Sequence, residues 1–395
     1  LWGFPYKTSQ NGGAAFVLIY IACVLLIGFV TMLSEIYLGR RSQANPMTAY
    51  KMVNKNLGWC GLVAIMIPAF IICYYSVLGG WTTKYALNSF SGNAGIVSTF
   101  SVNTGEVILY TALFLVLSVT IIMGGVKDGI EKASKVLMPV LFLILVAIAI
   151  YALTLGSGVR EGLAFYLKPD FSGITFKSVL VAMGQAFYSL SLGMGIMITY
   201  GSYVKDDVDL NKANNQIEIF DTGVAFLAGL MIIPAVYVFL GTDGMASGPS
   251  LTFISLPKVF AAMGGVGRVV GAVFFLALGF AALTSCVSVM ETLVANCMEI
   301  FHKSRKEMCA AVGVYSLVTA ILICLGYNAL YFELPLPNGS TAQLLDVMDY
   351  ISNSFLMPFI SLLTSILVGW VVGPKWIIAE VEKNGEHFGR AKLYS

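Results

Sequence analysis

An apolar stretch over residues 184–203 is long enough to span a bilayer, but two glycines, Gly193 and Gly195, interrupt its middle. Each glycine costs about 1 kcal/mol relative to alanine inside a helix. Backbone groups left open in hydrocarbon are costly, so such a break persists only where a polar partner is bound. The sequence therefore predicts an unwound segment over residues 190–195 between two half-helices, with its free backbone groups facing a ligand near the midplane. The alternative is an intact helix whose glycines allow close packing on a neighbour.

The composition of the whole chain is that of a polytopic membrane protein. Of 395 residues, 58% are hydrophobic and 11% are charged, and the mean hydropathy is +0.84, which fits no soluble globular class. Nine apolar runs are each long enough to cross a bilayer, at residues 14–38, 61–87, 107–123, 136–155, 178–200, 217–240, 269–297, 308–325 and 351–372. The chain opens inside a further apparent helix and stops in a basic segment, so we expect a fragment that starts within a first helix and ends after a tenth.

The distribution of charged residues and histidines narrows the functional class of the protein. Most lysines and arginines, including Arg40 and Arg41, fall in one set of loops, which the positive-inside rule places in the cytoplasm. The formal net charge of +2 is spread over the loops, so nucleic acid is not an expected partner. His302 and His387 both lie in cytoplasmic segments, so no Ser-His or Cys-His catalytic set forms at membrane depth, and we do not expect an enzyme.

Two carboxylates within apolar runs are candidate functional groups. Asp221 has no lysine or arginine within any apolar core to pair with, so it must be protonated, hydrogen-bonded or neutralised by a cation. Of these, we favour a bound cation. For Glu35 we favour a structural role, in which the carboxylate accepts hydrogen bonds from the opened backbone of the broken helix.

A pair of adjacent hydroxyls in a later run suggests a second cation site. Thr284 and Ser285, with the carbonyl of Ala281 one turn earlier, form half of an oxygen shell of the kind that sodium prefers. For either hydroxyl alone, a bond back to a carbonyl of its own helix is the usual explanation, and the spacing alone is a weak signal of a cation site.

Six motifs in order resemble the neurotransmitter:sodium symporter family, in its bacterial amino-acid-transporting branch. They are GFPY followed by NGG (residues 3–13), SEIYLGRR (34–41), Tyr74-Tyr75, FYSLSLGMGIMITYGSY (187–203), DTGVAFLAG (221–229) and AALTSCVSVME (281–291). The resemblance implies an all-α membrane protein with the leucine-transporter fold. In that fold five helices are repeated in inverted order and the first and sixth are broken, here as one domain (1–395) with repeats at about 1–155 and 176–372.

The resemblance also implies ion sites and chloride independence. Ser189 and Asp221 would bind a first sodium ion, and the Ala281 carbonyl, Thr284 and Ser285 would bind a second. Chloride-dependent relatives have a neutral asparagine at the position of Asp221, with a chloride nearby. Here the fixed carboxylate would supply that negative charge.

The substrate site follows in the same way. Tyr75 resembles the tyrosine that holds the substrate carboxylate, and backbone carbonyls around Tyr188 and Ser191 would take the ammonium. The implied substrate is a neutral hydrophobic or aromatic L-amino acid, because Met194 is an adaptable apolar side chain. For Ile71 and Val289, plain core packing is the alternative. The full set expected to line the substrate site is Ile71, Tyr75, Tyr188, Ser189, Ser191, Met194, Cys286 and Val289.

The resemblance further implies gates on both sides. Tyr188 would close the pocket from outside, residues 248–263 would form an extracellular hairpin, and Asp349 would be the acid of an outer gate. Gly3 stands where the family has the arginine of that gate, which predicts a weakened outer closure. Ser202 and Tyr203 with Glu299 resemble the inner gate. A second departure, Val30 in place of a usual proline, has no interpretation from the sequence.

Together with this resemblance, the sequence implies a sodium-coupled amino-acid symporter that works by alternating access in a bacterial inner membrane. Its expected partners are the amino acid, two sodium ions and lipid, with a homodimer as a further prediction and no organic cofactor. The main alternative is a non-transporting amino-acid sensor on the same fold, followed by a channel or an intramembrane enzyme.

Overall fold

The computed structural model describes residues 3–91, 103–156, 158–245, 251–335, 341–383 and 387–394. These residues are almost entirely helical. The part before the broken segment contains α1 (Gly3–Gln10), α2 (Ala14–Cys23), η1 (Val24–Gly28), α3 (Phe29–Ser42), α4 (Pro46–Val53), η2 (Lys55–Leu57), α5 (Gly58–Ser91), α7 (Thr104–Met123), η3 (Val126–Glu131), α8 (Lys132–Ala152) and α9 (Val159–Leu167).

The second part begins with the broken segment. It contains α10 (Phe176–Ser189), α11 (Ile196–Gly201), α12 (Leu210–Met245), η4 (Leu251–Ser255), α13 (Leu256–Ala262), α14 (Gly264–Phe301), α15 (Arg305–Leu325), β1 (Leu334–Pro335), β2 (Thr341–Ala342), α16 (Leu344–Asp349), η5 (Tyr350–Leu356), α17 (Met357–Ile366), η6 (Leu367–Val372), α18 (Pro374–Val381) and α19 (Ala391–Tyr394). The two short strands pair antiparallel.

Eight of the nine predicted spans are continuous helical runs. Among the described residues, the runs long and apolar enough to cross a membrane are 14–42, 55–89, 104–123, 126–152, 210–241, 264–301, 305–325 and 344–372. The ninth predicted span, 178–200, is divided between α10 and α11, neither of which is long enough to cross alone. Of the predicted hairpin over 248–263, residues 248–250 lie outside the described residues, and the rest forms η4 and α13.

Local sequence signals set the starts of three helices. Thr175 and Ser178 form a capping box at the beginning of α10, and Ser304 and Glu307 form another at the beginning of α15. Pro46 occupies the first turn of α4, where its missing N–H leaves no bond unmade. These local signals fix where the chain re-enters the bundle.

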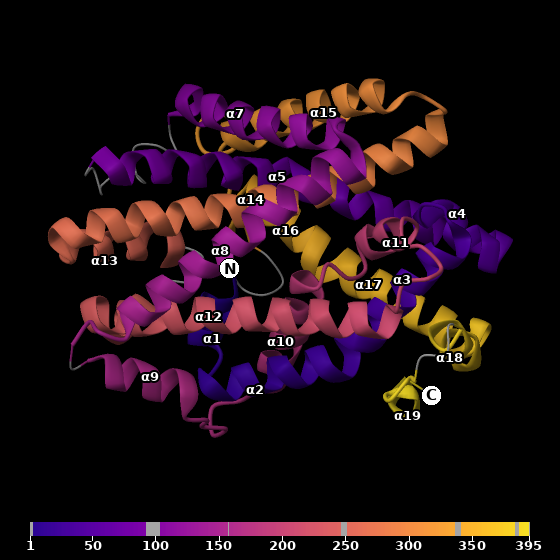
Figure 1. Ribbon diagram of the computed structural model, residues 1–395. Coiled ribbons are helices and arrows are strands. Elements are labelled where there is room, and N and C mark those ends of the chain that lie inside the picture. The colour runs from indigo at the N-terminus through magenta and orange to yellow at the C-terminus, as the bar shows by residue number, and fades with distance from the viewer. Residues whose placement is uncertain are drawn as a thin grey trace.

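The helices fall into two packed groups that lie side by side (Figure 1). In the first group α5 packs extensively on α14, and α7 and α15 cover one side of that pair. The second group holds α1, α2, α3, α10, α11 and α12. The segment α16–η5–α17 packs along α5, and α17 also touches α3. At one end of the molecule lie α4, α11 and α18, and at the other lie α9 and α13.

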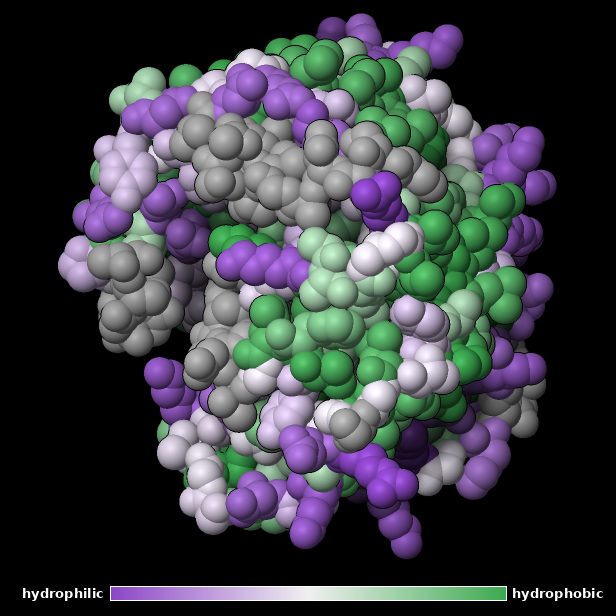
Figure 2. Space-filling view, turned by 90° about the vertical axis from the view of Figure 1, so that its left-hand side faces the viewer, coloured by the Kyte–Doolittle hydropathy of each residue, from purple (hydrophilic) through white to green (hydrophobic). Residues whose placement is uncertain are grey.

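The surface is that of a protein surrounded by lipid. Large apolar side chains on the flanks of the spans are strongly exposed, for example Val116 at 64%, Leu143 at 68% and Ile219 at 68%. Figure 2 views the end that carries α9 and α13, where hydrophobic side chains cover much of one flank and hydrophilic ones gather toward the rim. An apolar surface of this extent is stable only against another apolar phase, here the bilayer.

Candidate functional site

The break between α10 and α11 lies over residues 190–195, as the sequence predicts. Gly193 and Gly195 have φ of 72° and 71°, in the left-handed region that favours glycine. Ser191 also adopts a positive φ of 57°, which is uncommon for a residue with a Cβ. The chain is held in this shape in part by the Leu192 N–H, which donates to the Phe187 carbonyl at 2.9 Å.

A buried carboxylate binds the opened backbone. The N–H of Gly193 donates to Glu35 Oε1 at 2.7 Å, and Glu35 is completely buried on α3. On its other side Gly193 lies against helix α17, where an added Cβ would stand 2.5 Å from the Met357 carbonyl oxygen. A glycine is therefore required both for the backbone angle and for the close approach. The hydrogen bond is the one expected of Glu35 from the sequence.

The second intramembrane carboxylate, Asp221, lies next to the end of the outer half-helix. Its Oδ2 accepts a hydrogen bond from the Ser189 hydroxyl at 2.6 Å, and the Tyr20 hydroxyl lies 3.4 Å from the same oxygen. Helices α2, α10 and α12 thus converge on one charge. Within the described residues no lysine or arginine forms an ion pair with Asp221. The geometry brings together the two residues expected at the first sodium site.

The residues expected at the second ion site share one turn of α14. The Thr284 hydroxyl donates to the Ala281 carbonyl at 3.0 Å, so Thr284 uses one lone pair of the carbonyl oxygen that is expected to bind the ion. Ala281 and Ser285 also line a cavity between α5, α14 and η4, together with Tyr75, Leu78, Thr82, Phe253, Leu278 and Ala282. An ion bound here would have to displace the Thr284 hydrogen bond or share the carbonyl with it.

Of the expected substrate residues, four are half-buried, namely Tyr75, Tyr188, Ser189 and Ser191, and the other four are buried. Tyr75 and Ser285 meet at the cavity just described. Ile71, Met194, Cys286 and Val289 are at most 4% exposed and belong to one continuous apolar core, which fits both a closed pocket wall and ordinary core packing.

At the outer side, Asp349 has polar and charged neighbours from several helices. Its Oδ1 accepts a hydrogen bond from Asn353 Nδ2 at 2.6 Å, and the same amide donates to the Tyr74 hydroxyl at 3.1 Å. Lys7 on α1 interacts electrostatically with Asp349, and its Nζ lies 5.9 Å from the centre of the Tyr188 ring.

The weakened outer closure expected from Gly3 stays a prediction, although a basic residue elsewhere on α1 acts electrostatically on Asp349. Lys7 lies four residues after Gly3, one turn further along α1, and supplies a positive charge from the same helix. An added Cβ at Gly3 would face Gln185 Oε1 at 3.5 Å and not Asp349. The sequence signal was the lysine itself, next to Tyr6 in the GFPYK run. Val30, the second departure, continues α3 and carries the carbonyl that accepts the Ser34 hydroxyl at 2.7 Å, and nothing in the structure explains its exchange for proline.

Lys7→Gln is expected to weaken outer closure. The substitution keeps most of the stem that lies against Tyr188 but removes the charge opposite Asp349. We expect a few-fold faster labelling, from outside, of a cysteine placed at Thr82 in the cavity between α5, α14 and η4, because two partly screened opposite charges contribute about 0–1 kcal/mol and somewhat more once water is excluded. Lys7→Arg should retain slow labelling, and equal labelling rates in the Gln and Arg variants would show that the charge has no part in closure.

The inner end is organised differently from the sequence-based expectation. The hydroxyl of Tyr203 donates to Glu291 Oε1 at 2.8 Å, and Glu291 is paired with Arg305, whose Nε also donates to the Ile122 carbonyl at 2.8 Å. Glu299, expected to join Tyr203, lies two turns further along α14 and instead accepts bonds at the start of α4. Its partners there are the Asn45 N–H at 3.0 Å, the Asn45 amide at 2.8 Å and the Thr48 hydroxyl. The Ser202 hydroxyl bonds only to its own turn, at the Thr199 carbonyl.

The structure thus does not join Glu299 to Ser202 or Tyr203 by a hydrogen bond, and Glu291 is a carboxylate at this end that the sequence analysis did not include. A signal for it was present, since Glu291 lies within the apolar run 269–297, where an unpaired carboxylate is unstable. Its partner Arg305 could not be assigned from sequence, because the pairing depends on how α15 folds back along α14.

Comparisons with known proteins agree with this architecture. The profile described as "Sodium:neurotransmitter symporter family" matches residues 1–99 and 95–388. The chain is 33% identical to the uncharacterized sodium-dependent transporter YhdH of Bacillus subtilis, over all of this chain and 88% of that protein. It is 24% identical to the human sodium- and chloride-dependent GABA transporter 2, over 97% of this chain and 71% of that protein.

Among solved structures, the crystal structure of MhsT in complex with L-phenylalanine superposes with a TM-score of 0.90 at 36% identity, covering all of this chain and 90% of MhsT. The fold is thus the leucine-transporter fold, a multi-pass membrane architecture, and the family is one of sodium-dependent symporters and not of enzymes. The chain therefore belongs to the sodium:neurotransmitter symporter family.

Proposed function

We propose that this protein couples the inward movement of sodium to the uptake of a neutral hydrophobic or aromatic L-amino acid across the plasma membrane, without a need for chloride. The observation that carries the proposal is the contact between Ser189 and Asp221 beside the break in the helix. A half-buried carboxylate whose hydrogen-bond partners among the described residues are hydroxyls, next to open backbone carbonyls, has the chemistry of a site for a small hard cation.

Two sodium ions are the proposed cargo that drives uptake. The first would be held by Asp221 and the hydroxyl of Ser189. The second would be held by Thr284, Ser285 and the Ala281 carbonyl. Because Asp221 brings a fixed negative charge, the first ion needs no accompanying anion, which supports chloride independence.

The substrate is proposed to lie across the break, with its charged backbone groups at polar atoms and its side chain among apolar ones. Tyr75 would receive the carboxylate, and carbonyls near Tyr188 and Ser191 would receive the ammonium, with Ser189 close by. The wall around the side chain would consist of Ile71, Met194, Cys286 and Val289. The L-phenylalanine bound in the MhsT structure supports the proposal that the present protein, which is similar to MhsT, also takes an aromatic substrate.

Transport by alternating access requires that the two sides close in turn. The cluster of Lys7, Tyr188 and Asp349 is proposed to close the outer side. Tyr203 with the Glu291–Arg305 pair is proposed to close the inner side, because it joins the segment after α11 in the second helix group to α14 and α15 in the first.

Uptake into proteoliposomes tests the proposal. Labelled phenylalanine should accumulate above its external concentration when sodium is placed outside, and the accumulation should collapse when an ionophore dissipates the sodium gradient. Replacing external chloride by gluconate should leave uptake unchanged. Sodium-dependent binding of phenylalanine without accumulation would instead identify a sensor, and the transport proposal would be wrong.

Met194→Phe is expected to change substrate preference. If the thioether of Met194 borders the pocket, a rigid ring there would exclude aromatic substrates and favour smaller aliphatic ones. A misfit of a few methylenes changes discrimination by about 1–3 kcal/mol, or roughly 10–200-fold. Competition of unlabelled leucine, valine and tryptophan against labelled substrate gives the ranking. The same ranking in both proteins would show that Met194 does not border the pocket.

A further inference from the structure

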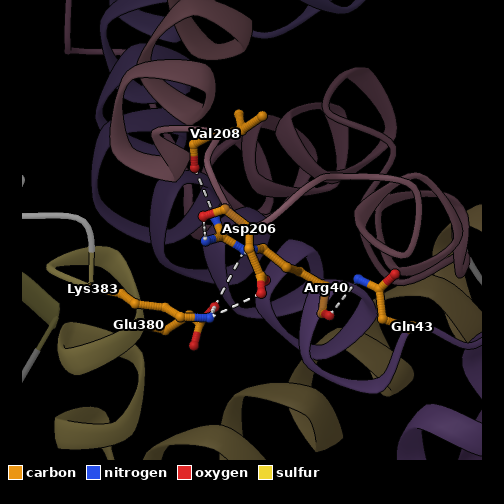
Figure 3. Close-up of polar contacts among 6 residues, drawn as sticks. All are labelled: Arg40, Gln43, Asp206, Val208, Glu380 and Lys383. Atoms are coloured by element: carbon orange, nitrogen blue, oxygen red, sulfur yellow. Dashed lines mark hydrogen bonds and ion pairs between the residues drawn. The ribbon is translucent and has the colours of Figure 1, made fainter.

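A buried arginine at the cytoplasmic end of α3 binds the backbone that follows the broken helix (Figure 3). Arg40 donates from Nη1 to the Val208 carbonyl at 2.8 Å and from Nη2 to the Asp206 carbonyl at 2.7 Å, and its side chain is only 1% exposed. A planar guanidinium with two such bonds fixes the position of its acceptors. The inner half-helix α11 is therefore held at its exit by α3.

Packing makes α3 and α11 a single unit. An added Cβ at Gly201 of α11 would stand 2.5 Å from the Ile36 carbonyl oxygen of α3, so the two backbones touch without intervening side chains. The two helices share one of the most extensive contacts in the second helix group. A movement of α11 must therefore carry the end of α3, and Arg40, with it.

Charged side chains connect helix α18 to this unit. Glu380 Oε1 lies 3.2 Å from Arg40 Nε, and Lys383 Nζ lies 3.2 Å from Asp206 Oδ2 and 4.0 Å from Glu380 (Figure 3). The four charges alternate in sign around a small ring. Lys383 holds the pKa of the Asp206 carboxyl below its usual value, so this carboxylate stays charged at neutral pH. Next to these four charges, the guanidinium carbon of Arg41 lies 6.0 Å from the centre of the aromatic ring of Trp376 on α18.

The same helix is connected to the other group. Through η6 and α17, α18 continues a segment whose earlier parts, α16 and η5, pack on α5. It has few contacts of its own with α3. The four charges around Arg40 therefore connect two parts of the protein on the cytoplasmic side. One part is the segment from α16 to α18, which packs on α5 of the first helix group, and the other is the α3–α11 unit of the second group.

We propose that α18 is a cytoplasmic clasp that holds the inner side closed, with Arg40 as the positioning residue through which it acts on the inner half-helix. This inference rests on the proposed alternating access. When the inner side opens, α11 and α3 move away from α18, so the pairs Arg40–Glu380 and Lys383–Asp206 separate. The clasp thus sets how much time the protein spends with its inner side closed.

A buried reporter on α11 tests the clasp. Thr199 is completely buried, so a cysteine at this position should react with a soluble maleimide only while the inner side is open. In Thr199→Cys protein in nanodiscs, sodium should slow labelling by favouring closure. Adding Glu380→Gln should raise the labelling rate in sodium at least threefold, and Lys383→Gln, which breaks a more exposed pair, should raise it less.

The controls separate the clasp from a general loss of structure. Glu382→Gln removes an exposed carboxylate two residues beyond Glu380 and should leave the labelling rate unchanged. Glu380→Asp should restore slow labelling in part. Labelling in Glu380→Gln and Lys383→Gln equal to that in Glu382→Gln would overturn the clasp. If sodium fails to slow labelling in the protein that carries Thr199→Cys alone, the proposed sodium-driven cycle is wrong, while the comparison of Glu380→Gln with Glu382→Gln still decides on the clasp.

Discussion

Gly193→Ala is expected to abolish sodium-driven uptake. A Cβ at this position stands 2.5 Å from the Met357 carbonyl oxygen, and the residue keeps a φ of 72°. The left-handed conformation costs a residue with a Cβ roughly 1–2 kcal/mol. Overpacking of a rigid core adds about 1–3 kcal/mol. The sum, about 2–5 kcal/mol, is enough to displace the break or to disrupt its hydrogen bond to Glu35.

The measurement is uptake together with the thermal midpoint of the purified protein. Gly184→Ala is the matched control, because Gly184 lies in the outer half-helix α10 and an added Cβ there meets no atom within 4 Å. It should keep full uptake and an unchanged midpoint. If Gly193→Ala behaves like Gly184→Ala, the backbone at the break adapts freely, and its precise shape does not determine transport.

The path of the broken helix was predictable because its signals are local. Glycines in the middle of an apolar run conflict with a continuous helix, and only a break with bound polar groups resolves the conflict. Glu35 followed from the same reasoning, since an opened backbone in a membrane needs an acceptor. The spans themselves follow from length and apolarity, and the structure keeps eight of them as single runs.

The gates could not be predicted to the same extent, because they depend on which turns of two helices meet. Glu291 and Glu299 are two turns apart on one helix, and nothing local says which of them reaches Tyr203. Lys7 places a positive charge one turn after Gly3 on α1, and a position-by-position comparison with the family pattern misses it. The ring around Arg40 joins residues more than 300 positions apart.

The two sides have one feature in common. Each proposed gate joins a charged or hydroxyl group of the second helix group to charges on other helices. Tyr188 of the outer cluster lies at the end of α10 beside the break, and Tyr203 of the inner cluster follows α11. We therefore expect binding at the break to act on both proposed gates. The ion proposed to bind next to the break is the natural trigger, which makes Asp221 the residue with the most informative substitution.

Asp221→Asn is expected to raise the sodium concentration for half-maximal uptake at least about tenfold and to make uptake respond to chloride. The variant keeps the shape and a hydrogen-bond acceptor for Ser189, so it isolates the charge. A unit charge about 4 Å from a cation contributes about 4 kcal/mol at an effective dielectric constant of 20, and every 1.4 kcal/mol corresponds to a factor of ten. Part of this loss is recovered because the neutral variant no longer buries a carboxylate.

Chloride distinguishes a role in charge balance from a role in shape. With Asn at position 221, a sodium ion would leave the site with a net positive charge in a water-poor surrounding, and a small anion would then stabilise it. Uptake by Asp221→Asn should therefore be higher in sodium chloride than in sodium gluconate, whereas the parent protein and the exposed-loop control Asp207→Asn should not distinguish the two salts. Equal sodium dependence in the parent and in Asp221→Asn would remove Asp221 from the ion site. A raised sodium requirement without any chloride effect would keep Asp221 as a ligand and contradict its part in replacing chloride.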